Sequence, residues 1–351
     1  MGVMDREVSD DTKARLGDFI GDAAKAPVEI TALARLPGGA IQENWLLDIS
    51  VEAGGDWTGD HELVLRMDAP SAVAASHGRA QEFALLKAAH KTGVTVPMPC
   101  LLGDDDAILG RPFFIMHRVR GTAAGHKLVK RPADDALAAA LGIELARIHT
   151  IIPESPEAAG LGFLTPLETS PALHAVALYR GYLDDLGQAR PALEWGLRWL
   201  ERNAPKANEV VLCHKDFRTG NYMVSNEGEL TGVLEWEFAG WSEPEEDIGW
   251  FCAKCWRFGA DGREAGGIAE RKPFYDAYER ESGRAIDPTR VAYWEAMAHV
   301  RWAAIACQQA ARHVSGEQPS LELALTQHVV PELELEVLKL TEGQTRRESD
   351  A

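Results

Sequence analysis

The first third of the chain is built of short apolar runs separated by polar residues and glycines. These runs are rich in Val, Ile, Leu and Phe, and each is too short for a typical helix. We therefore predict strands at 28–35, 45–51, 62–66 and within 110–121.

Longer segments carry apolar residues at steps of three and four, the period of an amphipathic helix. One such series is Leu137, Leu141, Leu145 and Ile148. We predict helices at 76–90, 134–150, 171–186, 190–203, 288–313 and 321–340. Strands that precede helices favour an α+β fold. The polar ends, 1–11 and 341–351, are expected to be frayed or disordered.

The most informative segment is 211–224, which reads VLCHKDFRTGNYMV. It places Asp216 after His214 and five residues before Asn221. That is the H-x-D-x-x-x-x-N spacing of a phosphoryl-transfer loop, in which Asp accepts the proton of the attacking hydroxyl and Asn binds a metal on the nucleotide phosphates. The spacing predicts a kinase.

A β-hairpin is expected directly after this loop, because two short apolar runs flank the turn-forming sequence Asn-Glu-Gly at 226–228. The open end of such a hairpin would bring Asn221 and Glu235 together. Their oxygens could share a magnesium ion held against nucleotide phosphates, with Glu237 as a further candidate ligand. Asp216 would lie beside them.

At these residues the sequence resembles the aminoglycoside phosphotransferase-like small-molecule kinases, and within them the kinase-like domain fused to certain acyl-CoA dehydrogenases. The resemblance rests on 214–221 and on 232–250, GVLEWEFAGWSEPEEDIGW. The family usually has G-V-[IL]-D-W-E followed by G-D-P, so Glu235 replaces the metal-binding Asp and Ser242-Glu243-Pro244 replaces G-D-P. The resemblance implies a two-lobed protein-kinase-like fold. The nucleotide-binding lobe, 1–117, would hold a small antiparallel sheet and a helix, and the catalytic and acceptor-binding lobe, 118–351, would be larger and mainly helical.

The same resemblance assigns nucleotide contacts in the first lobe. Gly38 and Gly39 would lie in a loop over the phosphates, although a Gly-Gly pair is also an ordinary hairpin turn. Arg66 would hold the α and β phosphates in the place of the usual strand lysine, and Glu82 would orient it through an ion pair. The alternatives are an Arg66–Asp68 pair and a solvated Glu82.

The segment 110–121 would run into the hinge between the lobes. There the resemblance places Met116 beside the adenine, with hydrogen bonds from backbone groups around His117 to Val119. We assign the His117 side chain no chemical role.

Arg218 and Asp247, near the catalytic loop, have two possible roles each. Arg218 would neutralise charge on the transferring phosphate, or it would form a structural salt bridge with Glu235, Glu237 or Asp247. Asp247 matches a later family Asp and would brace the loop, a role compatible with capping a helix that begins near Ile248. His214 is expected to hold the loop backbone.

Composition agrees with a globular enzyme and excludes some partners. The formal net charge of −18, from 36 basic and 54 acidic residues, argues against nucleic acid and anionic membranes. No apolar run approaches 18 residues, so the cytoplasm is the expected location. The cysteines are odd in number and scattered, which predicts reduced thiols with packing roles, the Cys252-x-x-Cys255 pair included.

The sequence thus predicts an enzyme that uses ATP, or GTP, with Mg²⁺ to phosphorylate a hydroxyl of a small molecule. The acceptor could be aminoglycoside-like, choline-like, a sugar or a hydroxyacyl compound. The alternative is a nucleotide-binding regulatory protein with weak or no transferase activity, because Glu235 and Glu243 replace the usual aspartates. Plausible acceptor-lining residues are His174, Tyr179, Tyr182, Trp256, Arg257, Trp302 and Gln309. The sequence does not fix the acceptor or the oligomeric state.

Overall fold

The computed structural model describes residues 9–36, 42–52, 55, 57–68, 76–104, 106–206 and 209–349. The chain forms two compact units. The first comprises Met1–Gly121 and Thr231–Phe238, and the second comprises Thr122–Leu230 and Ala239–Ala351.

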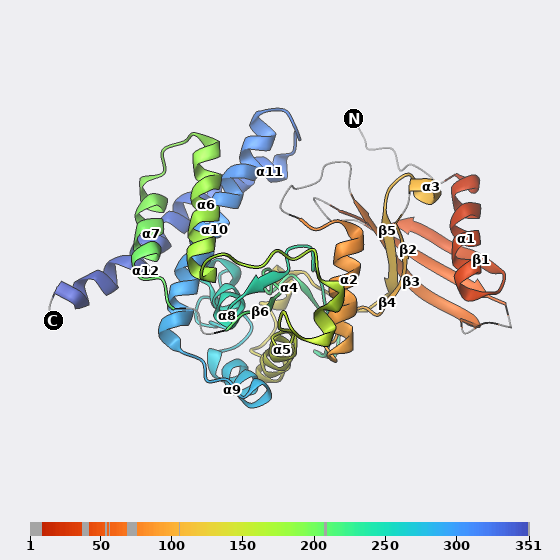
Figure 1. The fold of residues 1–351 in the computed structure, drawn as a ribbon, viewed down its shortest axis with the longest axis horizontal. Coiled ribbons are helices and arrows are strands. Elements are labelled where there is room, and N and C mark those ends of the chain that lie inside the picture. Colours follow the sequence, from red (N-terminus) through yellow and green to blue (C-terminus); the bar gives the residue numbers. More distant parts are fainter. Residues whose placement is uncertain are drawn as a thin grey trace. The chain divides into compact units, whose positions relative to one another are not determined.

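The first unit is centred on a five-stranded antiparallel sheet (Figure 1). The strand order is β1-β2-β3-β5-β4, so the longest strands, β2 and β3, lie inside the sheet. The strands are β1 (Val28–Arg35), β2 (Gln42–Val51), β3 (Gly59–Asp68), β4 (Pro99–Gly103) and β5 (Phe113–His117). All the predicted strands are present, because their β-branched and aliphatic residues pack well on a pleated surface.

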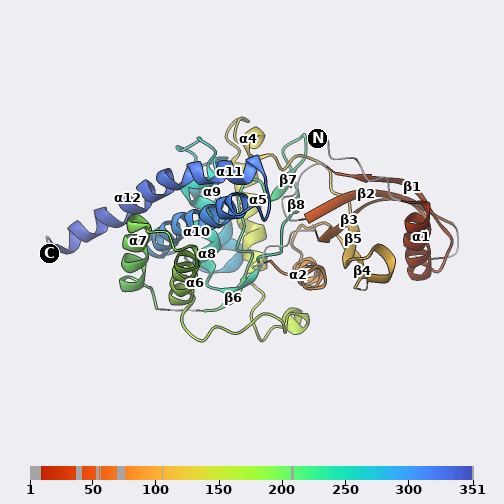
Figure 2. The same ribbon diagram turned by 90° about the horizontal axis from the view of Figure 1, so that it is seen from above.

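Two helices pack against this sheet (Figures 1 and 2). α1 (Asp10–Ala24) was not predicted; its Leu16 and Ile20 join the core formed by alternate residues of β2, β3 and β5. α2 (Arg79–Lys91) places Phe83 against Phe114, which points away from the α1 side of β5. The short helix α3 (Asp106–Leu109) completes the unit. Helices therefore cover both faces of the sheet.

The second unit is mainly helical, and its core surrounds the long helix α10 (Pro288–Val314). β6 (Val211–Cys213) pairs with β9 (Gly240–Ser242). β7 (Tyr222–Val224) and β8 (Leu230–Val233) form the predicted hairpin, and the chain passes into the first unit at Thr231, within β8. The remaining α-helices are α4 (Gly125–Leu128), α5 (Asp135–Ile148), α6 (Pro171–Leu186), α7 (Pro191–Arg202), α8 (Pro244–Cys252), α9 (Arg271–Ser282), α11 (Leu321–Thr326) and α12 (Val330–Ser349).

The α+β, kinase-like fold class is confirmed, but two details of the helix predictions are wrong. The single helix expected at 321–340 is divided into α11, a 3₁₀ turn and α12. The helix expected to begin near Ile248 begins at Pro244, because proline is favoured in a first turn, and Glu243 is its N-cap residue. Asp247 therefore lies inside α8 and does not cap it.

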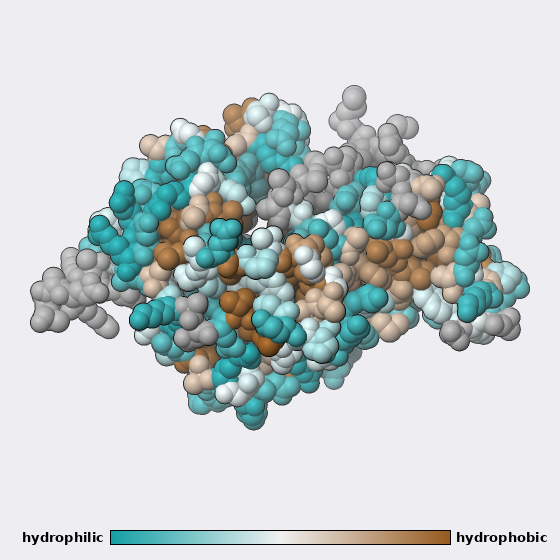
Figure 3. Space-filling model, viewed as in Figure 1, coloured by the Kyte–Doolittle hydropathy of each residue, from teal (hydrophilic) through white to brown (hydrophobic). Residues whose placement is uncertain are grey.

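The surface of the second unit is mixed in polarity. Figure 3 shows hydrophobic residues in brown where α6 lies, and Leu173 and Leu178 of this helix are exposed. None of the helices in the described ranges is both long and apolar enough to cross a membrane.

Candidate active site

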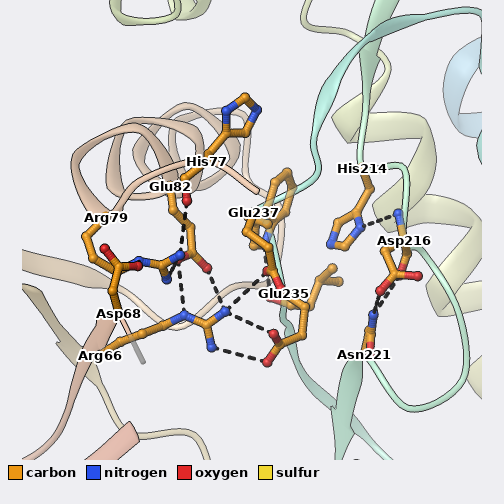
Figure 4. Close-up of polar contacts among 12 residues, drawn as sticks. Arg66, Asp68, His77, Arg79, Glu82, His214, Asp216, Asn221, Glu235 and Glu237 are labelled. Atoms are coloured by element: carbon orange, nitrogen blue, oxygen red, sulfur yellow. Dashed lines mark hydrogen bonds and ion pairs between the residues drawn. The ribbon is translucent and has the colours of Figure 1, made fainter. Parts of the chain in front are cut away.

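One cluster of residues predicted to bind nucleotide lies in the first unit and is centred on Arg66 of β3. Its Nη2 lies 2.9 Å from Glu82 Oε1, so the predicted ion pair is present. Both side chains are buried, which makes the alternative of a solvated Glu82 wrong. Two further glutamates point at the same guanidinium (Figure 4): Glu235 contacts it through both oxygens, at 3.2 and 2.9 Å, and Glu237 lies 3.2 Å away.

Arg79, which sequence reasoning missed, is the second cation of this cluster. Its side chain is buried, and it pairs with Glu82 one helical turn further along α2. Arg79 Nε also lies 2.8 Å from Asp68, so Asp68 is bound by Arg79 and the proposed Arg66–Asp68 alternative is wrong. The only signal in the sequence was the i, i+3 spacing of Arg79 and Glu82.

The charges in this cluster do not balance. Two arginines, Arg66 and Arg79, face four carboxylates, those of Asp68, Glu82, Glu235 and Glu237. Burial, together with the charge of Glu235, raises the pKa of Glu237 well above its usual value. Burial lowers the pKa of Arg66, but the facing glutamates outweigh this effect and raise it well above the ordinary value. Oxygen ligands with excess negative charge fit a divalent cation such as Mg²⁺.

Glu235 also has an unusual backbone conformation. Its φ of 64° is in the left-handed region, which costs a non-glycine residue on the order of 1 kcal/mol or more. About a third of its side chain, 31%, is exposed, whereas Glu82 and Glu237 are each 3% exposed. Among the three glutamates that contact Arg66, Glu235 is thus the accessible one.

The residues predicted to be catalytic lie in the second unit and are centred on Asp216. Its Oδ1 accepts hydrogen bonds from Arg218 Nε at 3.1 Å and from Trp250 Nε1 at 3.0 Å. Asn221 Nδ2 donates to Asp216 Oδ2 and, at 3.0 Å, to its backbone carbonyl (Figure 4). His214 Nδ1 accepts the backbone N–H of Asp216, as expected of a residue that holds the loop. Asp216 is therefore fixed by several donors.

Asp247 braces the loop from α8, as predicted. Its carboxylate accepts the backbone N–H groups of His214 and Lys215, each at 2.7 Å. It also contacts His149 Nε2 at 3.2 Å, and the other ring nitrogen of His149 bonds to Tyr278. Burial would raise the pKa of Asp247, but the hydrogen bond and charge of His149 with the His214 contacts lower it overall. His149, Asp247 and Cys213 are close enough to share a metal, yet these atoms already serve hydrogen bonds.

Arg218 has a structural partner other than those predicted. Its ion pair is with Asp216, and its guanidinium lies 4.3 Å from the ring centroid of Trp256. A pair with Glu235, Glu237 or Asp247 is not among its ion pairs in the described ranges. Its role towards a transferring phosphate stays a prediction.

The remaining nucleotide-binding predictions fall on two segments. Met116 and His117 end β5, but the N–H of His117 binds Met98 O at 2.9 Å and that of Arg118 binds Glu62 O at 3.0 Å. Those two N–H groups are thus engaged within the unit, while contacts at Met116 and Val119 stay predictions. Gly38 and Gly39 lie outside the described residues.

The acidic segment at the start of α8 is not an open cleft. Glu243 is fully buried, where it accepts Trp294 Nε1 at 2.6 Å and pairs with Arg290 of α10. Glu246 and Asp247 are also buried. Several of the suggested acceptor-lining residues pack into the core as well, namely Tyr179, Tyr182, Trp256 and Trp302.

Comparison with known proteins agrees with this geometry. The family model described as the phosphotransferase enzyme family matches residues 32–294. Solved structures share the fold across both units: a candidate aminoglycoside phosphotransferase from Ralstonia eutropha JMP134 has a TM-score of 0.73 at 20% identity, covering 94% of this chain and 98% of that one. A spectinomycin phosphotransferase, solved with ADP and spectinomycin, has a TM-score of 0.61 at 14% identity, with coverage of 92% and 98%.

The chain belongs to the phosphotransferase enzyme family. Among curated relatives, it is 27% identical over 290 residues to acyl-CoA dehydrogenase family member 11 of Pongo abelii, a match that covers 78% of this chain. The chain spans 37% of that relative and 18% of acyl-CoA dehydrogenase family member 10 of Mus musculus. The predicted family resemblance is confirmed.

Proposed function

We propose that this protein is an ATP- and Mg²⁺-dependent kinase that transfers the γ-phosphate to a hydroxyl of a small molecule. The observation that carries the proposal is Asp216, a carboxylate on the H-x-D-x-x-x-x-N loop that is held by three side-chain donors. A base that is fixed in this way needs little reorganisation to accept the proton of a bound hydroxyl. The brace from Asp247 keeps the loop backbone in place.

The remaining residues take roles in binding. Arg66, oriented by Glu82, would hold the α and β phosphates as a bidentate clamp. Glu235 and the side-chain oxygen of Asn221 would hold Mg²⁺, which when bound neutralises charge on the phosphates. Asn221 directs its Nδ2 at Asp216, which leaves its Oδ1 for this purpose. Arg218 would contribute positive charge near the transferred phosphate.

Nucleotide binding must compete with an internal contact. Glu235 occupies both terminal nitrogens of Arg66, the same groups that a phosphate would bind. If Glu235 ligated Mg²⁺ instead, Nη1 of Arg66 would lose its carboxylate partner while Nη2 kept Glu82 and Glu237, so we expect nucleotide affinity to depend on the metal. GTP is the alternative donor.

The test is nucleotide consumption by the purified protein with a panel of hydroxylated acceptors that includes aminoglycosides, macrolides, choline, sugars and hydroxyacyl compounds. Turnover should need Mg²⁺ and should fall at least about 100-fold in Asp216→Asn, which keeps the shape of the side chain but removes its basicity. The matched control is Asp185→Asn on the exposed end of α6, which should match the wild type. Equal turnover in Asp216→Asn and the wild type would contradict the proposal.

The second candidate function is a nucleotide-binding regulatory protein with weak or no transferase activity. It is favoured by one observation: Glu235 forms an ion pair with the Arg66 guanidinium that would otherwise bind phosphate. Glu235→Asp distinguishes the two functions, because the shorter side chain weakens this contact and restores the usual family residue. A large increase in turnover would show that Glu235 limits a working enzyme. Nucleotide binding without turnover in either form would favour the regulator.

A further inference from the structure

The indole of Trp250 makes a polar contact that packing alone does not explain. Trp250 lies on α8 and is 3% exposed, and its Nε1–H donates to Asp216 Oδ1 at 3.0 Å. The neighbouring Trp256 is similarly buried, yet its Nε1 has no hydrogen-bond partner within the described ranges. The two rings contact each other with centroids 5.1 Å apart. Of these two indoles, therefore, only that of Trp250 donates its N–H to Asp216.

The surroundings of Trp250 hold its ring in place. The guanidinium of Arg301, on α10, lies 4.1 Å from the ring centroid of Trp250. The guanidinium of Arg218 packs on the ring of Trp256, and its Nε donates a hydrogen bond to Asp216. The contacts form a closed ring of Asp216, Trp250, Trp256 and Arg218, with Arg301 attached to it. A cation–π contact is stronger where the cation is buried, as Arg301 is.

Arg301 has few other partners. Its side chain is 9% exposed, and its Nη1 is buried without a hydrogen bond in the part of the chain that the structure describes. Its ion pair is a long one, 3.7 Å to Glu246 Oε1. The Arg301 guanidinium thus has one long ion pair, with Glu246, and one close ring contact, with Trp250. A cation on the ring also withdraws electron density and strengthens the indole N–H as a donor.

The hydrogen bonds determine which oxygen of Asp216 is left to accept a proton. A carboxylate offers about four lone-pair positions, two on each oxygen. Oδ1 uses both, for Arg218 and Trp250, and Oδ2 uses one, for Asn221. One position remains, and it is on Oδ2.

We propose that Trp250 is a positioning residue that fixes the Asp216 carboxylate so that Oδ2 receives the proton of the acceptor hydroxyl. Arg301 and Trp256 hold the indole in the orientation that this requires. The inference rests on the proposed kinase function and assigns a role to a residue that does not itself touch the substrate. Without the indole N–H, Oδ1 keeps only the donor from Arg218, so rotation of the carboxylate about χ2 is less restricted.

The first test compares Trp250→Phe with a matched control, Trp294→Phe. Phenylalanine keeps an aromatic ring for Arg301 and Trp256 but removes the N–H. Trp294 also donates a buried indole N–H to a carboxylate, that of Glu243, away from Asp216. We expect Trp250→Phe to lower kcat about 10- to 100-fold with the KM for nucleotide unchanged. Trp294→Phe should lower Tm but keep kcat. Unchanged kcat in Trp250→Phe, or an equal loss in both variants, would overturn the proposal.

The second test needs no substrate. In an ¹H–¹⁵N spectrum of the full chain, the indole signal of Trp250 is the one that Trp250→Phe removes. It should shift upfield in Asp216→Ala, which deletes the acceptor, and stay in place in Asp185→Asn. If the Trp250 indole signal keeps the same chemical shift in Asp216→Ala, the hydrogen bond is absent and the proposal is overturned. If the contact is present but the wild type turns nothing over with any acceptor or with water, the proposed function fails and the positioning role fails with it.

Discussion

At the scale of single residues, we predict that removing the buried charge of Arg66 lowers stability and abolishes nucleotide binding. Arg66→Met would leave Glu237 buried without its cation and would leave Glu82 with Arg79 alone. We expect a loss of about 3–5 kcal/mol in the free energy of unfolding, measured by urea denaturation, and loss of nucleotide binding. The control is Arg35→Met, which breaks an ion pair with Glu43 whose arginine is 44% exposed. It should cost less than about 1 kcal/mol, and equal losses in the two variants would contradict the assignment.

Two buried carboxyls predict how stability depends on pH. Burial raises the pKa of Glu243 from 4.5 to about 7, and that of Glu295 likewise. A carboxyl whose pKa is higher in the folded state takes up a proton on folding. Its contribution to stability is therefore complete below pH 4.5 and is lost as the pH rises through 7. Tm should fall over this range in the wild type and fall less in Glu243→Gln. If Tm falls more steeply with pH in Glu243→Gln than in the exposed control Glu154→Gln, the predicted direction of this pH dependence is wrong.

The sequence predicted the residues that lie close together in the chain or match the family order. The loop around Asp216 and the Arg66–Glu82 pair are of this kind. Sequence reasoning missed Arg79, His149 and Trp250 as parts of the site, although each contacts one of its carboxylates. His149 and Trp250 are brought there by tertiary packing, 98 and 34 residues from their partners, and no local pattern carries that information.

At the scale of elements, the close approach of α8 and α10 predicts a contrast between two glycines. A Cβ on Gly249 of α8 would lie 2.6 Å from Trp294 Cβ and 2.9 Å from its backbone carbon. Gly249→Ala should therefore cost about 1–3 kcal/mol of stability, because the helices cannot separate without moving Asp247 and Trp250. Gly181→Ala, in α6 with no atom within 4 Å of the added Cβ, should gain about 0.5–1 kcal/mol. A loss in both variants, measured by urea denaturation, would contradict this packing argument.

Helix boundaries could be predicted where the sequence contains capping residues. α6 has the predicted bounds because Ser170 caps it, Pro171 begins it and Gly187 ends it in a left-handed conformation. α1 escaped prediction because its buried face consists of only Leu16, Ile20 and Ala24. The break between α11 and α12 immediately precedes Pro331, whose missing N–H and ring disfavour a continuous α-helix through the preceding turn.

At the scale of the whole molecule, the family order of strand cation, helix glutamate, catalytic loop and carboxylate is spread over two compact units. The fold class was predictable because strands precede helices and the family motifs are specific. The acceptor was not, because many different acceptors are used on one fold. Burial of Glu243, Glu246 and Asp247 removes the acidic surface that a cationic aminoglycoside would use there.

The most direct test of the central claim is transfer of an isotopically labelled γ-phosphate from ATP to a mixture of hydroxylated small molecules, followed by mass spectrometry. With Mg²⁺, the wild type and Asp185→Asn should form the same labelled phosphate ester, and Asp216→Asn should form at least about 100-fold less. A labelled ester that Asp216→Asn produces as fast as the wild type would contradict the account. So would a wild type that binds Mg²⁺ and ATP but leaves every acceptor unlabelled.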